Sequence, residues 1–198
     1  MEDGSLVGLG TGSTVVYLLQ ALADRGLDLR AVATSPQTEK AARELGISVE
    51  RFERLDQLDI VIDGADQIDP AGWLVKGGGG AHTREKVAAN AAERFVVIAS
   101  SDKIVDVLSP PVPLELLAYG AAATLRALER AQLRDVPPSP DGGLIADYLE
   151  EFSDPSALAA WLQATPGVVE HGLFPPKLVS EILVGDGSEV RRIVPSPV

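Results

Sequence analysis

Lys76 and Glu85 flank a run of four glycines, in the stretch KGGGGAHTREK at residues 76–86. Glycine adopts positive φ readily and lets backbone N–H groups approach a ligand closely. A carboxylate can remove a proton beside a carbonyl while an ammonium stabilises the oxyanion that develops, so this pair suits proton abstraction. A flexible linker with an exposed Lys–Glu pair is the alternative interpretation. The position between an expected strand and an expected helix disfavours the linker.

Asp63 and Asp66 lie in a second polar stretch, DGADQID at residues 63–69, directly after an apolar run. Two carboxylates three residues apart could bind sugar hydroxyls or move protons between oxygens. The alternative is a solvated turn, because Asp and Gly are common turn residues. The stretch lacks the spaced oxygen ligands and terminal Glu of a calcium loop, so we predict no metal site here.

A glycine-rich turn, GLGTGST at residues 8–14, separates an apolar run from a helical pattern. Backbone N–H groups of such a turn and the following helix N-terminus suit a phosphate, and the Ser13 and Thr14 hydroxyls could add hydrogen bonds. A tight turn with a Ser or Thr cap is the alternative. A dinucleotide site is rejected, because Ser13 stands at the third fingerprint glycine and the strand at 29–34 lacks the following acid. No lysine follows, which excludes a Walker motif.

Three further polar residues are weaker candidates. Lys103, in SSDKIVDVL at residues 100–108, could supply positive charge to a phosphate, although a single loop lysine is usually only solvated. His82 and His171 have no partner residues that would form a catalytic triad or a metal site. We therefore predict neither a metal nor a cofactor.

These candidates require a framework of alternating strands and helices, with each candidate at the end of a strand. Strands are expected at 5–10, 29–34, 47–50, 58–66, 73–76 and 94–100, and helices at 14–26 (capped by Ser13 or Thr14), 36–46 and 83–95. Alternation of this kind predicts a mainly parallel sheet. Ligands bind such sheets outside the carboxyl ends of the strands, which is where all the candidates fall.

The pattern changes near SPPVPLE at residues 109–115, where three prolines indicate a boundary or hinge. The expected elements beyond it are a helix at 119–133, a strand at 143–150, a helix at 154–164, a strand at 167–174 and a hairpin at 180–194. A helix N-cap at Asp154 followed by Pro155 starts the second of these helices. This order of elements predicts a smaller α+β domain.

The overall composition narrows the class of protein. The chain has 198 residues, of which 45% are hydrophobic and 23% charged, and it has no cysteine. No apolar run approaches the length of a membrane span and the acidic start lacks a signal-peptide layout, so we expect a cytoplasmic protein without a membrane partner. The formal net charge of −12 argues against nucleic acid as a partner. An anionic substrate would need local cations.

The motifs GLGTGST, DGADQID, KGGGGAHTREK and SDKIVDVL, with PGVVEHGLF at 166–174, together closely resemble ribose-5-phosphate isomerase A over nearly the whole chain. The resemblance implies an α/β fold: a Rossmann-like, mainly parallel sheet with helices on both faces, plus a smaller α+β (ferredoxin-like) domain inserted near the C-terminal end. It implies a discontinuous large domain at 1–108 and 175–198, with 109–174 as the small domain. The family interconverts ribose 5-phosphate and ribulose 5-phosphate in the pentose phosphate pathway without metal or organic cofactor, usually as homodimers or homotetramers.

The resemblance also implies roles for individual residues. Glu85 matches the general base of the family, and Asp63, Asp66 and Lys76 match its other catalytic residues. The substrate-binding positions that it implies are Thr11, Gly12, Ser13, Thr14, Gly64, Ala65, Gly77, Gly78, Gly79 and Lys103.

Three other classes of function were weighed. A sugar-phosphate sensor of a transcription regulator would need a DNA-binding helix-turn-helix and a basic face, and would not need Glu85 with Lys76. A nucleotide-dependent oxidoreductase is disfavoured by Ser13 and the missing acid. A CoA transferase or amino-sugar isomerase on the same fold would place its carboxylates differently.

Overall fold

The computed structural model describes residues 1–195, which form two compact units. The first unit comprises Met1–Gly64, Arg84–Ser101 and the described residues from Lys177 onward. The second unit comprises Ala65–Thr83 and Asp102–Pro176. The chain therefore enters and leaves each unit more than once, so both units are discontinuous in sequence.

The bounds of these compact units differ from those of the expected domains, 1–108 with 175–198 and 109–174. The expected domain division stays a prediction. Residues 65–83 belong to the second unit because two of its strands, β5 (Gln67–Ile68) and β6 (Leu74–Val75), pair antiparallel with each other. In the same three-stranded sheet β6 also pairs antiparallel with β12 (Leu173–Phe174). The short strand β5 was not expected from the sequence.

A seven-stranded sheet forms the centre of the first unit, in the order β14-β13-β7-β4-β1-β2-β3. Its strands are β1 (Leu6–Leu9), β2 (Arg30–Ala33), β3 (Ser48–Glu50), β4 (Leu58–Asp63), β7 (Ala92–Ser100), β13 (Glu181–Asp186) and β14 (Glu189–Ile193). All neighbouring pairs are parallel except β13 with β14, which form the expected hairpin. The predicted mainly parallel sheet is confirmed.

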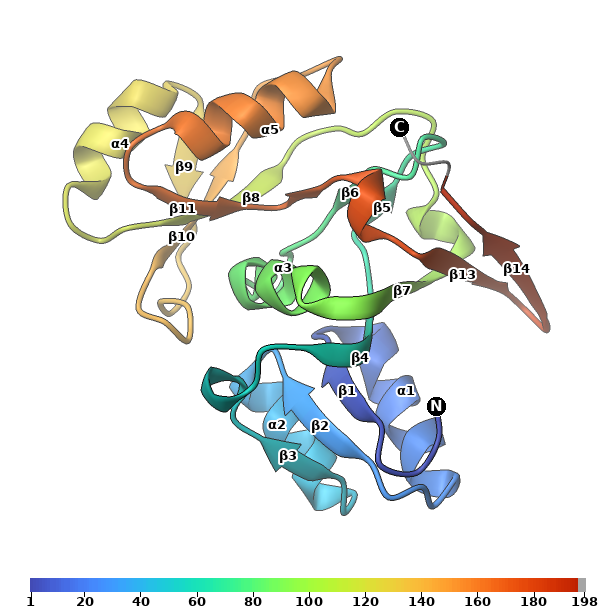
Figure 1. Ribbon diagram of the computed structural model, residues 1–198. Coiled ribbons are helices and arrows are strands. Elements are labelled where there is room, and N and C mark those ends of the chain that lie inside the picture. The colour runs from blue at the N-terminus through green and yellow to red at the C-terminus, as the bar shows by residue number, and fades with distance from the viewer. Residues whose placement is uncertain (196–198) are drawn as a thin grey trace. The chain divides into compact units, whose positions relative to one another are not determined.

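Three helices connect the parallel strands: α1 (Ser13–Asp24), α2 (Pro36–Glu44) and α3 (His82–Asn90). From β1 the chain moves across the sheet to β2 and β3, whereas from β4 it moves the other way to β7. Because such crossovers are right-handed, α1 and α2 lie on one face and α3 on the other, as Figure 1 shows. The direction reverses between β1 and β4, so this is the topological switch point where open α/β sheets bind ligands.

Apolar side chains from both the sheet and its helices fill the core of this unit. Val7 and Leu9 of β1 are fully buried and pack in one cluster with Val15, Leu19 and Leu22 of α1. Strand β4 is buried along nearly its whole length. Near-continuous burial of central strands is what helices on both faces of a parallel sheet produce.

The ends of the helices depart from the sequence expectations in two places. The N-cap of α1 is Gly12 and makes no side-chain hydrogen bond, so the predicted Ser13 or Thr14 cap is wrong. Helix α3 ends at Asn90, before the predicted end at residue 95, because β7 begins at Ala92 and pairs with β4. Pairing with a central strand here overrides the helical pattern of the sequence.

A four-stranded antiparallel sheet, in the order β11-β8-β10-β9, forms most of the second unit. Its strands are β8 (Val112–Leu116), β9 (Ala131–Leu133), β10 (Leu144–Tyr148) and β11 (Val168–His171), and its helices are α4 (Ala121–Leu128) and α5 (Pro155–Ala164). The expected α+β character is confirmed.

Within residues 1–195, three single-turn 3₁₀ helices complete the two units: η1 (Phe52–Arg54), η2 (Ser101–Lys103) and η3 (Pro176–Leu178).

One element of this unit was predicted incorrectly. The expected helix at 119–133 is shorter, because Ala131–Leu133 forms β9 and pairs with β10. The boundary or hinge expected at the proline-rich stretch 109–115 stays a prediction, and the end of this stretch forms β8, the strand between β10 and β11. Val112, Leu114 and Leu116 are fully buried there, and their burial outweighs the tendency of proline to break a strand.

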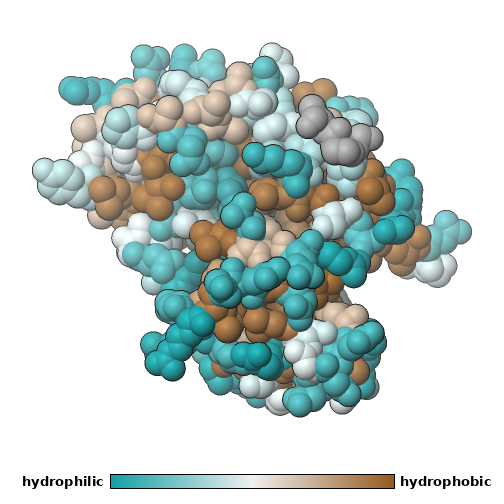
Figure 2. Space-filling view, viewed as in Figure 1, coloured by the Kyte–Doolittle hydropathy of each residue, from teal (hydrophilic) through white to brown (hydrophobic). Residues whose placement is uncertain are grey.

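Hydrophilic and hydrophobic residues are interspersed on the face seen in Figure 2. Exposed apolar side chains such as Tyr17 and Tyr119 are usual on folded proteins. Within residues 1–195, no helix has the length and apolar character needed to cross a membrane.

Candidate functional site

The first unit brings the turn after β1 and the end of β4 together at the topological switch point. Asp63 is the last residue of β4 and is fully buried. Its Oδ1 atom accepts hydrogen bonds from the backbone N–H groups of Thr11 (3.1 Å) and Gly64 (2.7 Å). Two of the expected sequence motifs therefore meet at one carboxylate, and both contribute backbone donors that hold it.

A cluster of hydroxyl groups supports this turn from the side of α2. The Thr38 hydroxyl donates to the Gly10 carbonyl oxygen (2.9 Å), and the Thr34 hydroxyl donates to the Leu9 carbonyl oxygen (3.2 Å). Thr11 Oγ1 lies 2.9 Å from Thr34 Oγ1. Thr34 and Thr38 were not predicted from the sequence. Thr34 directly follows β2, the strand beside β1, and Thr38 lies near the start of α2, and this position was the signal that could have pointed to them.

The start of α1 is a site with exposed backbone donors. Gly12 has a φ angle of 128°, a value that residues other than glycine rarely adopt. No side chain caps the helix. The first turn carries no acidic residue. Ser13 is exposed and Thr14 half-buried, so hydroxyls and N–H groups of this turn can reach an anion. A phosphate is the anion that such helix starts commonly bind.

Glu85 lies in the first turn of α3 and is only 4% exposed. Thr83, the second residue of α3, belongs to the second unit. Its Oγ1 atom donates to the buried Glu115 carboxylate (Oε2, 2.5 Å). Ser139 Oγ donates to the other oxygen of Glu115 (2.5 Å). Glu115 was not expected from the sequence to have a role, and it anchors the start of the helix that carries Glu85.

In the second unit, the structure brings Asp66 and the glycine run together. The Asp66 backbone N–H donates to the Val75 carbonyl oxygen (2.8 Å), which fixes Asp66 beside β6. Its Oδ2 atom accepts a hydrogen bond from the Gly78 N–H (2.8 Å). Asp66 as a whole is exposed. An exposed carboxylate with one backbone donor is well placed to bind a hydroxyl group.

Lys76 directly follows β6 and is almost entirely buried, with 2% of its surface exposed. Its Nζ atom lies 5.4 Å from the centroid of the Phe174 ring, within the range of a cation–π interaction. The Lys76 N–H donates to the Gly172 carbonyl oxygen (2.8 Å). A β-carbon on residue 172 would lie 2.1 Å from the Lys76 carbonyl oxygen, so this close approach requires glycine.

The glycine run is a hydrogen-bonded turn. The Gly80 N–H donates to the Gly77 carbonyl oxygen (3.0 Å), and Gly77 has φ of 108°. A β-carbon on Gly77 would lie 2.6 Å from Nδ1 of His82 and 2.8 Å from Cβ of Pro113. His82 is fully buried, and its ring occupies the space that glycine leaves open. The turn is therefore closely packed on one side.

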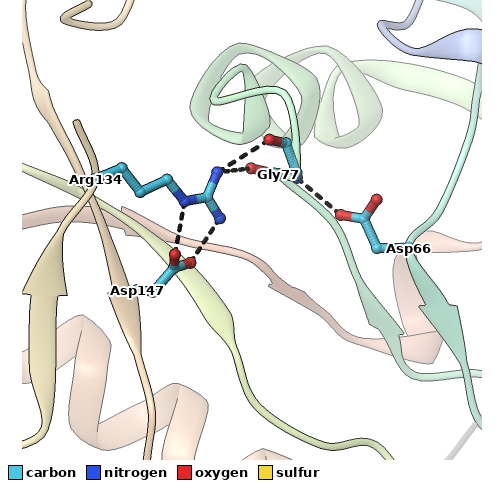
Figure 3. A network of polar contacts seen from close by, with 5 residues as sticks. Asp66, Gly77, Arg134 and Asp147 are labelled. Carbon is cyan, nitrogen blue, oxygen red and sulfur yellow. Dashed lines mark hydrogen bonds and ion pairs between the residues drawn. The ribbon is translucent and has the colours of Figure 1, made fainter. Parts of the chain in front are cut away.

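Arg134 and Asp147 complete this part of the site, and neither was predicted from the sequence. Arg134 binds the Asp147 carboxylate through Nε and Nη2, and its Nη1 donates to the carbonyl oxygens of Gly77 and Gly78 (3.0 Å each), as Figure 3 shows. Arg134 directly follows β9, one residue beyond the helix expected at 119–133. The signal that could have found the pair was the acidic Asp147 within the apolar strand 143–150.

The remaining predicted positions are more exposed. Lys103 ends η2 and its Nζ atom lies 3.2 Å from the Asp102 carboxylate, with 41% of its side chain exposed. Ala65 is half-buried just beyond β4, and Gly79 is exposed. Residues 1–195 hold no group of three or more His, Cys, Asp or Glu side chains arranged to bind a metal ion.

Comparison with known proteins places this geometry in a family. Residues 30–189 match the sequence profile of ribose 5-phosphate isomerase A (phosphoriboisomerase A). The chain is 46% identical over 210 residues to ribose-5-phosphate isomerase A of Natronomonas pharaonis, covering 96% of this chain and 91% of the relative. The enzyme of the same name from Caulobacter vibrioides is 43% identical over 211 residues, covering 98% and 92%.

Solved structures agree with these sequence relatives. Ribose 5-phosphate isomerase A of Methanocaldococcus jannaschii superposes with a TM-score of 0.91 at 31% identity, covering 98% of this chain and 92% of the other. A D-ribose-5-phosphate isomerase in complex with phospho-erythronic acid superposes with a TM-score of 0.90 at 33% identity and the same coverage. The chain therefore belongs to the ribose 5-phosphate isomerase A family.

Proposed function

We propose that this protein is an aldose–ketose isomerase that interconverts D-ribose 5-phosphate and D-ribulose 5-phosphate. The observation that carries this proposal is family membership over nearly the full length of the chain. The relative that binds phospho-erythronic acid adds support. That molecule carries a phosphate and a planar carboxylate, and the carboxylate resembles the planar, negatively charged O1–C1–C2–O2 group of an enediolate.

In the proposed reaction, Glu85 acts as the general base on the ring-opened sugar. Its carboxylate removes the proton from C2 of the aldose, and the electron pair forms the C1–C2 double bond while negative charge develops on O1. The hydroxyl proton of O2 then passes to O1, and Glu85 returns the abstracted proton to C1 as the C2 carbonyl forms. The low exposure of Glu85 supports this role, because a buried side chain is held in place and shielded from bulk water.

Lys76, Asp63 and Asp66 have supporting roles in this proposal. The Lys76 ammonium stabilises the oxyanion that develops on the substrate. The two carboxylates bind hydroxyl groups and relay their protons. The backbone N–H groups of Thr11 and Gly64 hold the Asp63 carboxylate in place through Oδ1.

The 5-phosphate binds at the start of α1 in the proposed complex, where Ser13 and Thr14 supply hydroxyls and N–H groups, with Lys103 as a further positive charge. The uncapped helix start and the lack of an acidic residue in its first turn support this assignment. A role in the pentose phosphate pathway, a cytoplasmic location and a homodimeric or homotetrameric state stay predictions.

An isomerase assay with ribose 5-phosphate alone tests the function. We expect the purified chain to form ribulose 5-phosphate, with the same rate when EDTA is present, because no proposed step uses a metal. The Glu85→Gln variant serves as the matched inactive control. Absence of ribulose 5-phosphate from the wild-type reaction would contradict the proposal, and loss of activity with EDTA would contradict its metal-free chemistry.

A further inference from the structure

The Arg134 side chain makes four hydrogen bonds within the second unit, two to Asp147 and two to the glycine run. Its Nε and Nη2 atoms bind the two carboxylate oxygens of Asp147 at 2.7 and 2.6 Å. The remaining terminal nitrogen, Nη1, donates to the carbonyl oxygens of Gly77 and Gly78, each at 3.0 Å (Figure 3). The guanidinium thus links β10, through Asp147, to two consecutive peptide groups of the turn.

The orientation of those two peptide groups follows from this contact. Both are trans, and in a trans peptide the C=O and N–H bonds point in opposite directions. Because the Gly77 carbonyl faces Arg134, the Gly78 N–H faces away from it and donates to Oδ2 of Asp66 (2.8 Å). The Gly78 carbonyl also faces Arg134, so the Gly79 N–H is directed away from the guanidinium in the same manner.

A glycine run can be held in this way only through its backbone. Glycine has no side chain to pack and a wide range of accessible φ and ψ, so an unrestrained run samples many orientations of its N–H groups. Arginine is suited to the restraint because its planar fork binds a carboxylate with two donors and leaves a third donor free. The side chains of Arg134 and Asp147 are only 18% and 20% exposed, so water competes less than at an open surface pair.

We propose that Arg134 is a positioning residue for the isomerase reaction, which it serves by fixing the peptide groups of Gly77, Gly78 and Gly79. It thereby sets the orientation of the Asp66 carboxylate and presents the Gly79 N–H to an oxygen of the substrate. Asp147 holds the guanidinium in the required plane. This inference rests on the function proposed above, since the reaction supplies the substrate that the loop positions.

Arg134→Gln tests the proposal, with Arg130→Gln as the matched control. Arg130 is in the same unit and pairs with Glu150 at 2.9 Å, but both side chains are exposed, 69% and 49%. We expect Arg134→Gln to lower kcat for ribose 5-phosphate by about 10- to 100-fold, because misplacing a catalytic group by about 1 Å costs this much. KM should change less than kcat. Arg130→Gln should retain the wild-type values.

Two further measurements separate positioning from a loss of folding. Amide hydrogen exchange in the full chain should accelerate at Gly78 and Gly80, whose N–H groups are hydrogen-bonded, in Arg134→Gln, while the amides of α5 keep their wild-type rates. In Arg134→Ala, guanidinium at non-denaturing millimolar concentrations should restore part of kcat, and Arg134→Lys should restore less because it cannot bind the carboxylate and both carbonyls in one plane.

Failure of the positioning role of Arg134 can be distinguished from failure of the proposed isomerase function. If the wild type forms no ribulose 5-phosphate, the isomerase assignment fails whatever the variants do. If the wild type is active and Arg134→Gln keeps both its kcat and its exchange rates at Gly78 and Gly80, the positioning role is overturned. A kcat that falls only in proportion to the unfolded fraction, without rescue by guanidinium, also overturns it.

Discussion

Gly10 packs directly against the Asp63 carboxylate: a β-carbon on residue 10 would lie 1.9 Å from both Cγ and Oδ1 of Asp63. Atoms that are not bonded to each other cannot approach so closely. Either the carboxylate or the turn after β1 must therefore move if residue 10 gains a side chain. The glycine here is required by the space that the carboxylate occupies. The glycine-rich turn thus serves the packing of Asp63 as well as the binding of an anion.

We expect Gly10→Ala to lower both stability and activity. Overpacking of this kind lowers the free energy of unfolding by about 1–3 kcal/mol, and displacement of Asp63 should reduce kcat in the variant that remains folded. Urea unfolding and the isomerase assay measure the two effects. Gly185→Ala is the control, since its nearest neighbour, the Ala99 carbonyl oxygen, would be 3.9 Å from the new β-carbon. Equal stability of the two variants would contradict the steric argument.

Glu85→Gln should abolish most of the activity while keeping the fold. The amide has nearly the shape of the carboxylate but cannot accept the C–H proton, and general base catalysis typically supplies ~10²–10⁴-fold in rate. We expect kcat to fall by at least about 100-fold. Glu44→Gln, an exposed site at the end of α2, is the matched control and should behave as wild type. Near-normal turnover by Glu85→Gln would rule out this residue as the base.

Glu181 links three strands of the first unit through two arginines. The guanidinium groups of Arg192 and Arg94 donate to Oε2 and Oε1 of its carboxylate (2.5 Å each). These hydrogen bonds hold the pKa of Glu181 below its usual value of 4.5, and the bond from Arg192 has the larger effect. A carboxyl whose pKa is lower in the folded state stabilises that state above the unfolded pKa, and this contribution is lost as pH falls through the folded pKa.

The free energy of unfolding should therefore depend on Glu181 in a pH-specific way. At pH 7 we expect Glu181→Gln to unfold at lower urea concentration than wild type. The difference should shrink below about pH 4.5, the ordinary value, as the wild-type carboxyl becomes protonated. Urea titrations of both proteins between pH 7 and the acid limit of folding measure it, with Glu53→Gln as the control for loss of an exposed charge. A difference that grows on acidification would contradict the assignment.

Asp154→Ala tests a feature that concerns stability alone. Asp154 caps α5, and its Oδ1 atom accepts hydrogen bonds from the N–H groups of Ser156 (2.9 Å) and Ala157 (3.0 Å). Removing such a cap costs about 0.5–2 kcal/mol of unfolding free energy. We expect this loss in thermal or urea unfolding, with kcat unchanged at temperatures where the variant is folded. A variant as stable as wild type would show that the cap contributes nothing.

The same cap illustrates what the sequence could predict. Asp154 followed by Pro155 indicates a helix start through local hydrogen bonding and fixed φ, and both are decided by residues adjacent in the chain. The strands of the parallel sheet were likewise predictable, because burial on both faces leaves uninterrupted apolar runs such as the one in β4. The position of Asp63 at the end of that strand followed from the same run.

Features that depend on distant residues were not predictable in this way. The end of α3 is decided by pairing of β7 with β4, and β9 exists because β10 provides a partner. Arg134 contacts the carbonyl oxygens of Gly77 and Gly78, 57 and 56 residues earlier in the chain. A backbone carbonyl has no sequence signature, so no motif indicates which side chain will bind it.

This last contact also bears on the order in which the protein folds. Contacts between residues far apart in sequence form late, because closing the intervening chain costs entropy before any contact forms. The glycine turn should therefore stay disordered until β9 and β10 have paired and Arg134 and Asp147 face each other. On refolding, we expect the Gly78 amide to gain protection from exchange after the amides of β10, so that this turn is among the last parts of its unit to become ordered.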